Sequence, residues 1–529
     1  MHIVIADALP ESATEPFLQR GWTVDARSGR TPDDLARDLA GADALIVRSA
    51  TQVTAALLDA APKLRVIARA GTGVDNVDLD AASARGVLVL NAAGANSISV
   101  AELTVGLMIA LARGIAAADA SMKQGAWDKK RFTGIELRGK LLGIIGFGRI
   151  GREVAARARA FGMDVVAHDP FIGARAADTA AVPLVALDDL LQRAEFVTLH
   201  VPSLPETRHL LNAARLSTCR RGVRIINTAR GELVDEAALA DAIERGVVAG
   251  AAVDVFEREP PVDRRLASLP QVVATPHIAA STREAQELVG VEVAAAVRDY
   301  LSDGVIRNAV NFPAIPVEEM PALRPFLQAA AQLGQFVAQL APERPQAIGI
   351  RYYGELVTRH EAIVGSSVLS GALSPFVDGS VTQVNARKLA AERGIDVIES
   401  RSTRPRDFVN VVSVKLHGAG GERWAEATVL HPNRPRLCSL DGIDIDMPLA
   451  GTLIVIRNDD TPGVIGSVGT ILGRHGVNIG SFGLGRSDGS AIGVLAVDPA
   501  PGLAAAVDEL KTLESVRDVR VVALSRATP

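Results

Sequence analysis

Short apolar runs alternate with helical patterns over the first half of the chain. Between residues 1 and 95, apolar runs such as HIVIADA, ADALIVRS and LRVIARAG are separated by segments such as TPDDLARDLAG. Between residues 140 and 280 the alternation returns with six apolar runs, from KLLGIIGFG to VVATPH. Strands that alternate with helices form parallel sheets with helices on both faces. The pattern therefore predicts two lobes, each built on a parallel sheet.

Further elements divide the chain into four parts. One helix over residues 100–120 is expected to link the two lobes, and another over 281–303 to return to the first. The segment NFPAIPVEEMPALRP is rich in proline and marks a boundary. Strand-like and helical runs mix between 317 and 450, and from 452 the order is βαββαβ, a ferredoxin-like unit. The predicted domains are 1–97 with 282–310, 98–281, 317–450 and 452–526.

The composition excludes several classes of protein. The chain has 529 residues and a net charge of −5, so no basic field points to nucleic acid or to an anionic membrane. The two cysteines are too few for a disulfide framework, and the N-terminus has no signal-peptide pattern. We expect a cytoplasmic protein without a membrane span, a nucleic-acid partner or a metal site.

A glycine motif follows the first strand of the second lobe. Gly146, Gly148 and Gly151 stand in a G-x-G-x-x-G frame between an apolar strand and an Ala-rich helix. These glycines permit a tight turn, a close approach to a pyrophosphate and close helix packing. Asp169 ends the next strand, where a carboxylate binds ribose hydroxyls and repels a 2′-phosphate. The motif predicts a dinucleotide site that prefers NAD.

Three later strands of the second lobe end in residues suited to oxidising an alcohol. Arg230 follows RIINTA, Asp254 and Glu259 follow AGAAV, and His277 follows VVATP. Ligands of such sheets bind beyond the carboxyl ends of the strands. A histidine is the usual proton acceptor, a carboxylate orients it, and an arginine holds a substrate carboxylate. Each residue alone has an ordinary structural explanation, but their joint placement favours a catalytic site.

The segments GFGRIGREVAARARAFGMDVVAHDP, NTARGELVDE, DVFEREPP and TPHIAAST closely resemble the D-isomer-specific 2-hydroxyacid dehydrogenases. The resemblance implies that Arg230 anchors the substrate, that Glu259 partners His277, and that His277 is the acid and base. It implies that Asp254 contacts the nicotinamide end of NAD. The other implied cofactor contacts are Arg149, Ile150, Thr228, Ala229, Arg230, His277, Ile278, Ala279 and Ala280.

The first lobe holds the candidates for substrate specificity. Arg48 and Ser49 end one strand, the backbone at Gly71, Thr72 and Gly73 offers an anion-binding nest, and Asn96 precedes the linking helix. Lys129 lies in a basic run that is either a solvated surface or part of the site. Basic side chains and a nest suit a substrate with a second anion, such as a phosphate.

The first lobe and the two C-terminal parts resemble long members of this family that oxidise 3-phospho-D-glycerate to 3-phosphohydroxypyruvate. That resemblance implies an α/β fold with two Rossmann-like parallel-sheet lobes for substrate and NAD, an α+β intervening domain and a C-terminal βαββαβ ACT domain. It also implies that Arg48, Asn96 and Lys129 grip the substrate, the lysine coming from a neighbouring subunit of a homotetramer. The implied effector is L-serine, held by Asn458, Asp460 and Asn478.

Two alternatives stay open. One is an enzyme for another D-2-hydroxyacid, such as glycerate or glyoxylate, although such relatives usually lack the two C-terminal domains. The other is an NAD-sensing, corepressor-like binding protein, which the acidic net charge and the complete Arg-Glu-His set disfavour.

Overall fold

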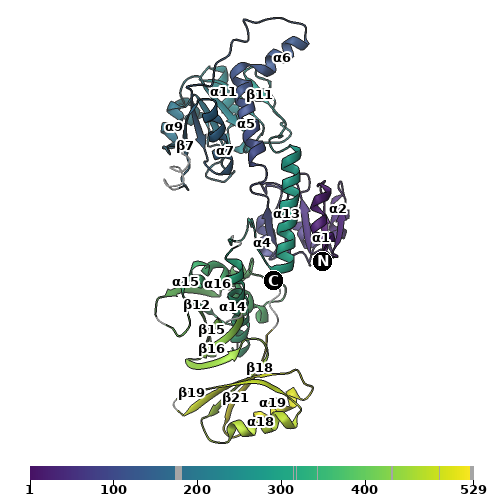
Figure 1. Cartoon of the computed structure of the whole chain (residues 1–529), viewed down its shortest axis with the longest axis vertical. Coiled ribbons are helices and arrows are strands. Elements are labelled where there is room, and N and C mark those ends of the chain that lie inside the picture. Colours follow the sequence, from purple (N-terminus) through teal and green to yellow (C-terminus); the bar gives the residue numbers. More distant parts are fainter. Residues whose placement is uncertain are drawn as a thin grey trace.

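The structure is a computed structural model that describes residues 1–172, 182–313, 315–316, 318–341, 343–404, 406–430, 433–487 and 489–524. Four sheets follow one another along its longest axis (Figure 1). The predicted domain ends at 317 and 526 lie outside the described residues.

The first lobe is a five-stranded parallel sheet in the order β2-β1-β3-β4-β5. Its strands are β1 His2–Ile5, β2 Thr23–Ala26, β3 Ala44–Val47, β4 Val66–Arg69 and β5 Leu88–Asn91. Its helices are α1 Glu15–Leu18, α2 Pro32–Leu39, α3 Ala55–Asp59, α4 Leu79–Ala84 and the later α13 Arg283–Asp303. The central strand β3 is buried along its whole length, as expected for a parallel strand with both faces covered.

The second lobe is a six-stranded parallel sheet in the order β11-β10-β9-β8-β6-β7, and all six predicted strands are present. Its strands are β6 Leu141–Ile145, β7 Asp164–His168, β8 Phe196–Leu199, β9 Val223–Asn227, β10 Val248–Val253 and β11 Val272–Ala274. Its helices include α7 Arg149–Ala160, α9 Leu187–Arg193, α10 Ala213–Thr218, α11 Glu236–Glu244 and α12 Arg265–Ser268. The strand order reverses at β6, which creates a crevice at the carboxyl ends of the strands.

The helix that links the lobes is broken, so the prediction of one helix over 100–120 is wrong. The structure has α5 Ser97–Arg113 and α6 Ile115–Lys123, which are bent by 65°. Gly114 has a φ of 60°, the left-handed conformation in which glycine ends a helix. Among the described residues, no single helix is long and apolar enough to cross a membrane; α5 and α6 reach that length and composition only as this bent pair.

The third sheet is mixed, in the order β13-β12-β14-β15-β16-β17, and the α+β prediction is confirmed. Its strands are β12 Ala347–Tyr353, β13 Asp396–Ser402, β14 Val411–Gly418, β15 Gly421–Leu430, β16 Arg434–Leu440 and β17 Ile443–Pro448. Its helices are α14 Met320–Leu340, α15 Glu355–Arg359, α16 Glu361–Leu373 and α17 Ala386–Glu392.

The tail has the predicted βαββαβ order and an antiparallel sheet, β19-β20-β18-β21. Its elements are β18 Gly451–Asp459, α18 Val464–Arg474, β19 Ile479–Ser487, β20 Ser490–Val497, α19 Leu503–Leu510 and β21 Val516–Leu524. Both helices lie on the side of the tail's sheet that faces away from the rest of the chain (Figure 1).

One apolar core is continuous from the first lobe through α14 to β21 of the tail. Hydrogen bonds join the same parts. The Thr382 hydroxyl donates to the carbonyl of Gly86 in the first lobe at 3.1 Å. The side-chain amide of Gln339 on α14 donates to the carbonyl of Ala523 at 3.0 Å and accepts from its N–H at 2.9 Å. The tail is therefore packed, through α14, onto the lobe that holds part of the candidate site.

Candidate active site

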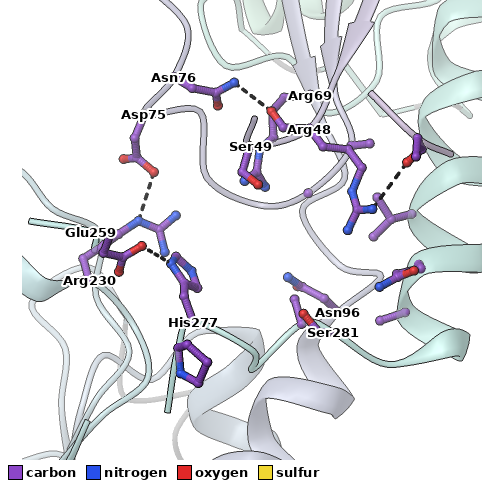
Figure 2. Close-up of a pocket in the computed structure, with 18 of the residues that line it drawn as sticks. Arg48, Ser49, Arg69, Asp75, Asn76, Asn96, Arg230, Glu259, His277 and Ser281 are labelled. Carbon is purple, nitrogen blue, oxygen red and sulfur yellow. Dashed lines mark hydrogen bonds and ion pairs between the residues drawn. The ribbon is translucent and has the colours of Figure 1, made fainter. Parts of the chain in front are cut away.

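A cleft of about 960 Å³ opens between the two lobes, and most of the predicted catalytic and substrate residues line it (Figure 2). Strand ends of the first lobe form one wall, and the loops after β9, β10 and β11 form the other. Its lining includes Arg48, Ser49, Arg69, Gly71, Asp75, Asn96, Arg230, Glu259 and His277.

His277 and Glu259 form a hydrogen-bonded pair at the edge of this cleft. The Nδ1 atom of His277 lies 2.7 Å from Oε2 of Glu259, and Oε1 accepts from the N–H of Phe256 at 3.1 Å. Burial raises the pKa of Glu259, but the bond with His277 and the bond from Phe256 outweigh it, so the net pKa lies below the ordinary range. Glu259 thus stays a carboxylate at neutral pH, and Nε2 of His277 has no partner among the described residues.

A buried carboxylate holds the loop that carries His277. Asp254, at the end of β10, has no exposed surface. Its Oδ1 accepts from the Thr275 hydroxyl at 2.5 Å and from the Ile278 N–H at 2.9 Å, and its Oδ2 accepts from the Ala279 N–H at 2.9 Å. His277 itself has a φ of 52°, which is uncommon for a residue other than glycine. The three hydrogen bonds that Asp254 accepts from this loop hold His277 in that conformation.

Arg230 follows β9 and reaches across the cleft. Its Nε donates to Asp75 of the first lobe at 3.0 Å (Figure 2). Its Nη1 donates to the Ala229 carbonyl at 2.6 Å. The guanidinium lies on the same side of the cleft as the His277–Glu259 pair, which suits a group that binds a carboxylate beside the reacting carbon.

The predicted substrate residues of the first lobe are only partly gathered at the cleft. Arg48, Ser49, Gly71 and Asn96 line it, whereas Thr72 and Gly73 do not. Thr72 donates its hydroxyl to Asn96 Oδ1 at 2.8 Å, so it orients that amide. The N–H of Gly71 donates to the Arg69 carbonyl. Of the predicted anion-binding nest, only the N–H groups of Thr72 and Gly73 therefore remain for a ligand.

Sequence reasoning missed Arg69, which ends β4 and lines the cleft. Its Nε is buried and has no hydrogen-bond partner among the described residues. Burial lowers the pKa of its guanidinium, and the charge of Arg230 lowers it further. Leaving a buried N–H of a charged group without a partner costs free energy, which an anionic ligand would recover. The signal was present, because Arg69 ends a strand just as Arg48 does.

Lys129 is exposed and lies in the segment after α6, away from the cleft. In Figure 1, α6 lies at the end of the second lobe that is farthest from the first lobe. The structure of one chain therefore does not bring Lys129 to the other candidate residues.

The glycine motif lies at the crevice where the strand order of the second lobe reverses. Gly146 has a φ of 94°, and a Cβ on Gly151 would lie 2.2 Å from the Gly146 carbonyl oxygen, so both positions require glycine. A Cβ on Gly148 would meet nothing within 4 Å, which leaves open space at the N-terminus of α7. Asp169 accepts from the Phe147 N–H at 2.9 Å and so lies against the glycine turn. This cradle fits a dinucleotide pyrophosphate.

The remaining predicted cofactor residues differ in their burial and in their partners. Arg149 and Ile150 begin α7, and Ile278 is exposed whereas Ala279 is buried. Thr228 is also buried, and its hydroxyl is bonded to that of Thr104 on α5. Ala229 joins Thr228 to Arg230, and Ala280 lines the cleft.

The structure separates the three residues predicted to bind an effector in the tail. Both β18 and β19 are antiparallel to β20, so Asn478 before β19 lies at the opposite end of the sheet from Asn458 and Asp460 at the end of β18. Asn478 donates to Asp498 at 2.8 Å, and Asp460 accepts from Arg486 at 2.8 Å. One chain cannot hold a small ligand with all three residues.

Comparisons with known proteins agree with this architecture. Residues 105–279 match the model for the NAD binding domain of D-isomer specific 2-hydroxyacid dehydrogenases, 322–441 that for the D-3-phosphoglycerate dehydrogenase intervening domain, and 452–515 the ACT domain. The chain is 39% identical over 525 residues to the D-3-phosphoglycerate dehydrogenase of Methanocaldococcus jannaschii, which covers 99% of each chain. The chain belongs to the D-3-phosphoglycerate dehydrogenase family.

Other relatives of this family differ in how much of the chain they match. The D-3-phosphoglycerate dehydrogenase of Mycobacterium tuberculosis is 42% identical over 481 residues, 90% of each chain. A solved glyoxylate reductase from Paecilomyes thermophila is 29% identical with a TM-score of 0.55, and it covers 59% of this chain and 98% of its own. The family makes this chain an NAD-dependent oxidoreductase, with NAD as its cofactor.

Proposed function

We propose that this enzyme oxidises 3-phospho-D-glycerate to 3-phosphohydroxypyruvate, the first step of L-serine biosynthesis. The observation that carries the proposal is the convergence of three arginines, Arg48, Arg69 and Arg230, on the cleft that holds the His277–Glu259 pair. A substrate with a carboxylate and a phosphate provides the anions that such a cleft requires. The names of the full-length relatives support the same substrate.

The residues of the cleft divide the chemistry between them. Arg230 binds the substrate carboxylate, and His277 accepts the proton of the hydroxyl group at Nε2. Glu259 stabilises the imidazolium that this transfer creates. NAD, when bound in the second lobe, accepts the hydride. Asp254 holds the loop that presents His277, and Gly146, Gly148, Gly151 and Asp169 bind the dinucleotide.

Arg48 and Arg69 bind the phosphate, assisted by Ser49 and by the amide of Asn96. The unpaired Nε of Arg69 gains its partner when the phosphate arrives. Hydrogen bonds between charged groups are worth about 1.5–3 kcal/mol each, so the phosphate contributes strongly to substrate preference.

An assay of NADH formation with 3-phospho-D-glycerate, D-glycerate and D-lactate tests the proposed function. Two charge-assisted bonds to the phosphate correspond to a preference in kcat/KM of about 10²- to 10⁴-fold for the phosphorylated acid. Arg69→Gln is expected to reduce that preference and to leave turnover of D-glycerate nearly unchanged. A preference of the unmodified enzyme for either unphosphorylated acid would contradict the proposal.

The alternatives fit the chain less well. The glyoxylate reductase structure covers only 59% of this chain, so the alternative of a glycerate or glyoxylate enzyme leaves the third sheet and the tail without a counterpart. An NAD-sensing binding protein has no need for a proton acceptor paired with a carboxylate, nor for three arginines in one cleft.

We infer that the working enzyme is a homotetramer in the cytoplasm. Lys129 binds substrate in the cleft of a neighbouring subunit, because it lies away from the cleft of its own chain. The proposed domains are 1–97 with 282–310 for substrate, 98–281 for NAD, 317–450 as the intervening domain and 452–526 as the ACT domain.

Cys219 and Cys438 are free, and burial raises their thiol pKa values to about 11 and about 12, so both stay protonated.

We further propose that L-serine inhibits the enzyme by binding between the ACT domains of two subunits. β19 is an edge strand, and antiparallel pairing of two such edges places the start of one β19 at the end of the other. Asn478, which precedes β19 in one subunit, then lies near the end of β19 in the partner subunit. At that end Arg486 donates to Asp460. Asn458 and Asp460 from one side and Asn478 from the other hold the amino acid.

A serine titration of the full-length enzyme tests this regulation. We expect saturable inhibition at or below millimolar L-serine, weaker inhibition of Asn478→Ala, and none by D-serine, because the polar groups on the two sides fix one stereoisomer. The continuous core from β21 through α14 to the first lobe is the route for the effect. Full activity of the unmodified enzyme at millimolar L-serine would remove this part of the proposal.

A further inference from the structure

One ion pair joins the two lobes across the cleft. Nε of Arg230, after β9 of the second lobe, lies 3.0 Å from Oδ2 of Asp75, after β4 of the first lobe. Asp75 is 67% exposed, whereas Arg230 is only 26% exposed. The two residues are separated by 155 positions in the chain, and the pair lies directly beside the His277–Glu259 pair (Figure 2).

The contacts of Arg230 fix how its guanidinium is turned. Nε is bonded to Asp75 and Nη1 to the Ala229 carbonyl. Nη2 lies against Gly73, where a Cβ would come within 1.8 Å of it. A guanidinium has five N–H groups, so both hydrogens of Nη2 and one of Nη1 remain for a ligand. One hydrogen of Nη1 and one of Nη2 together make an edge that can bind a carboxylate with two parallel bonds.

Charge also favours this arrangement. Arg48, Arg69 and Arg230 line one cleft, and the charge of Arg230 lowers the pKa of Arg69. Both carboxylate oxygens of Glu259 are already hydrogen-bonded, one to His277 and the other to the N–H of Phe256. Asp75 is the carboxylate that is hydrogen-bonded to Arg230, and it is bonded at Nε, away from the edge that remains for the substrate.

We propose that Asp75 is a positioning residue, which holds Arg230 across the cleft and presents the free edge of its guanidinium to the substrate carboxylate. The inference rests on the proposed role of Arg230 in binding substrate. It applies to any 2-hydroxycarboxylate, because it concerns the carboxylate and not the phosphate. Asp75 stays bound to Nε when the substrate arrives, so it does not compete for Arg230.

Steady-state kinetics of Asp75→Asn, with the best substrate of the panel above, tests the inference. We expect the KM for the hydroxy acid to rise about 3- to 30-fold, corresponding to about 0.6–2 kcal/mol. The kcat should stay within about threefold and the KM for NAD should not change, since neither His277 nor the glycine motif is touched. Asp80→Asn removes an exposed carboxylate on the nearby α4 and should change none of these values.

Two further variants keep the test decisive. Gly73→Ala places a methyl group where Nη2 lies, so it should raise the same KM without removing a charge. In an Arg230→Lys background, which has no Nε donor of this kind, Asp75→Asn should have little further effect. An unchanged KM in Asp75→Asn would overturn the inference, and a lower KM would show that Asp75 competes with the substrate. A panel preference for an unphosphorylated acid would contradict the proposed substrate but leave this test standing.

Discussion

Replacing His277 with alanine is expected to lower kcat by about 10²- to 10⁴-fold, the range that general acid–base catalysis contributes. The imidazole lines the cleft, and its pairing with Glu259 at 2.7 Å through Nδ1 leaves Nε2 for the substrate hydroxyl. Binding of NADH, followed by its fluorescence, should stay nearly intact because the glycine motif is untouched. Near-full activity of His277→Ala would refute the assignment.

The backbone at His277 calls for a second variant. Its φ of 52° strains alanine, whereas asparagine tolerates this conformation. His277→Asn should therefore keep the loop folded and lose kcat to the same extent, which separates the loss of the proton acceptor from a displaced loop.

Glu259→Gln is the matched control for the partner. The amide keeps a hydrogen-bond acceptor but provides no negative charge for the imidazolium. We expect a smaller loss of kcat and a shift of the acidic limb of the kcat/KM profile to lower pH. The lowered pKa of Glu259 keeps its carboxylate charged through the neutral and mildly acidic range, so the charge is there to be removed by the substitution.

The parts of the fold that follow local periodicity could be predicted from the sequence. The strand before Gly146, the helix after it and the six strands of the second lobe all appear as expected. The break at Gly114 was missed because the apolar pattern continues through it, and only the backbone conformation of that residue ends α5.

The site was predictable where one rule applied, namely that ligands bind at the carboxyl ends of strands. That rule located Arg230, Asp254, Glu259 and His277, and it also applied to Arg69, which was missed. Contacts between distant segments carry no local signal. The Arg230–Asp75 pair and the separation of Asn478 from Asn458 depend on how lobes and strands are placed in space.

Asp254→Asn is expected to be the second most damaging change, because the carboxylate accepts three hydrogen bonds from the loop that carries His277. An asparagine keeps one acceptor oxygen and places an NH₂ group against either the Ala279 N–H or the Thr275 and Ile278 donors. Bonds to a charged group are worth about 1.5–3 kcal/mol each, and a buried N–H without an acceptor costs about 1–3 kcal/mol. The loop should leave its position, and a shift of about 1 Å at a reacting group costs about 10²-fold in rate.

The measurement has to separate a role in holding the loop from a role in binding the cofactor. If Asp254 holds the loop, Asp254→Asn should lower kcat by about 10²-fold and destabilise the second lobe by a few kcal/mol, a fall in Tm of several degrees. Thr275→Val removes only one of the three bonds and should give a loss of kcat and of Tm in the same direction but smaller. A raised KM for NAD with unchanged Tm and kcat would instead assign Asp254 to the nicotinamide end of the cofactor. The geometry favours the first outcome, because Asp254 has no exposed surface and both of its oxygens are bonded to the loop.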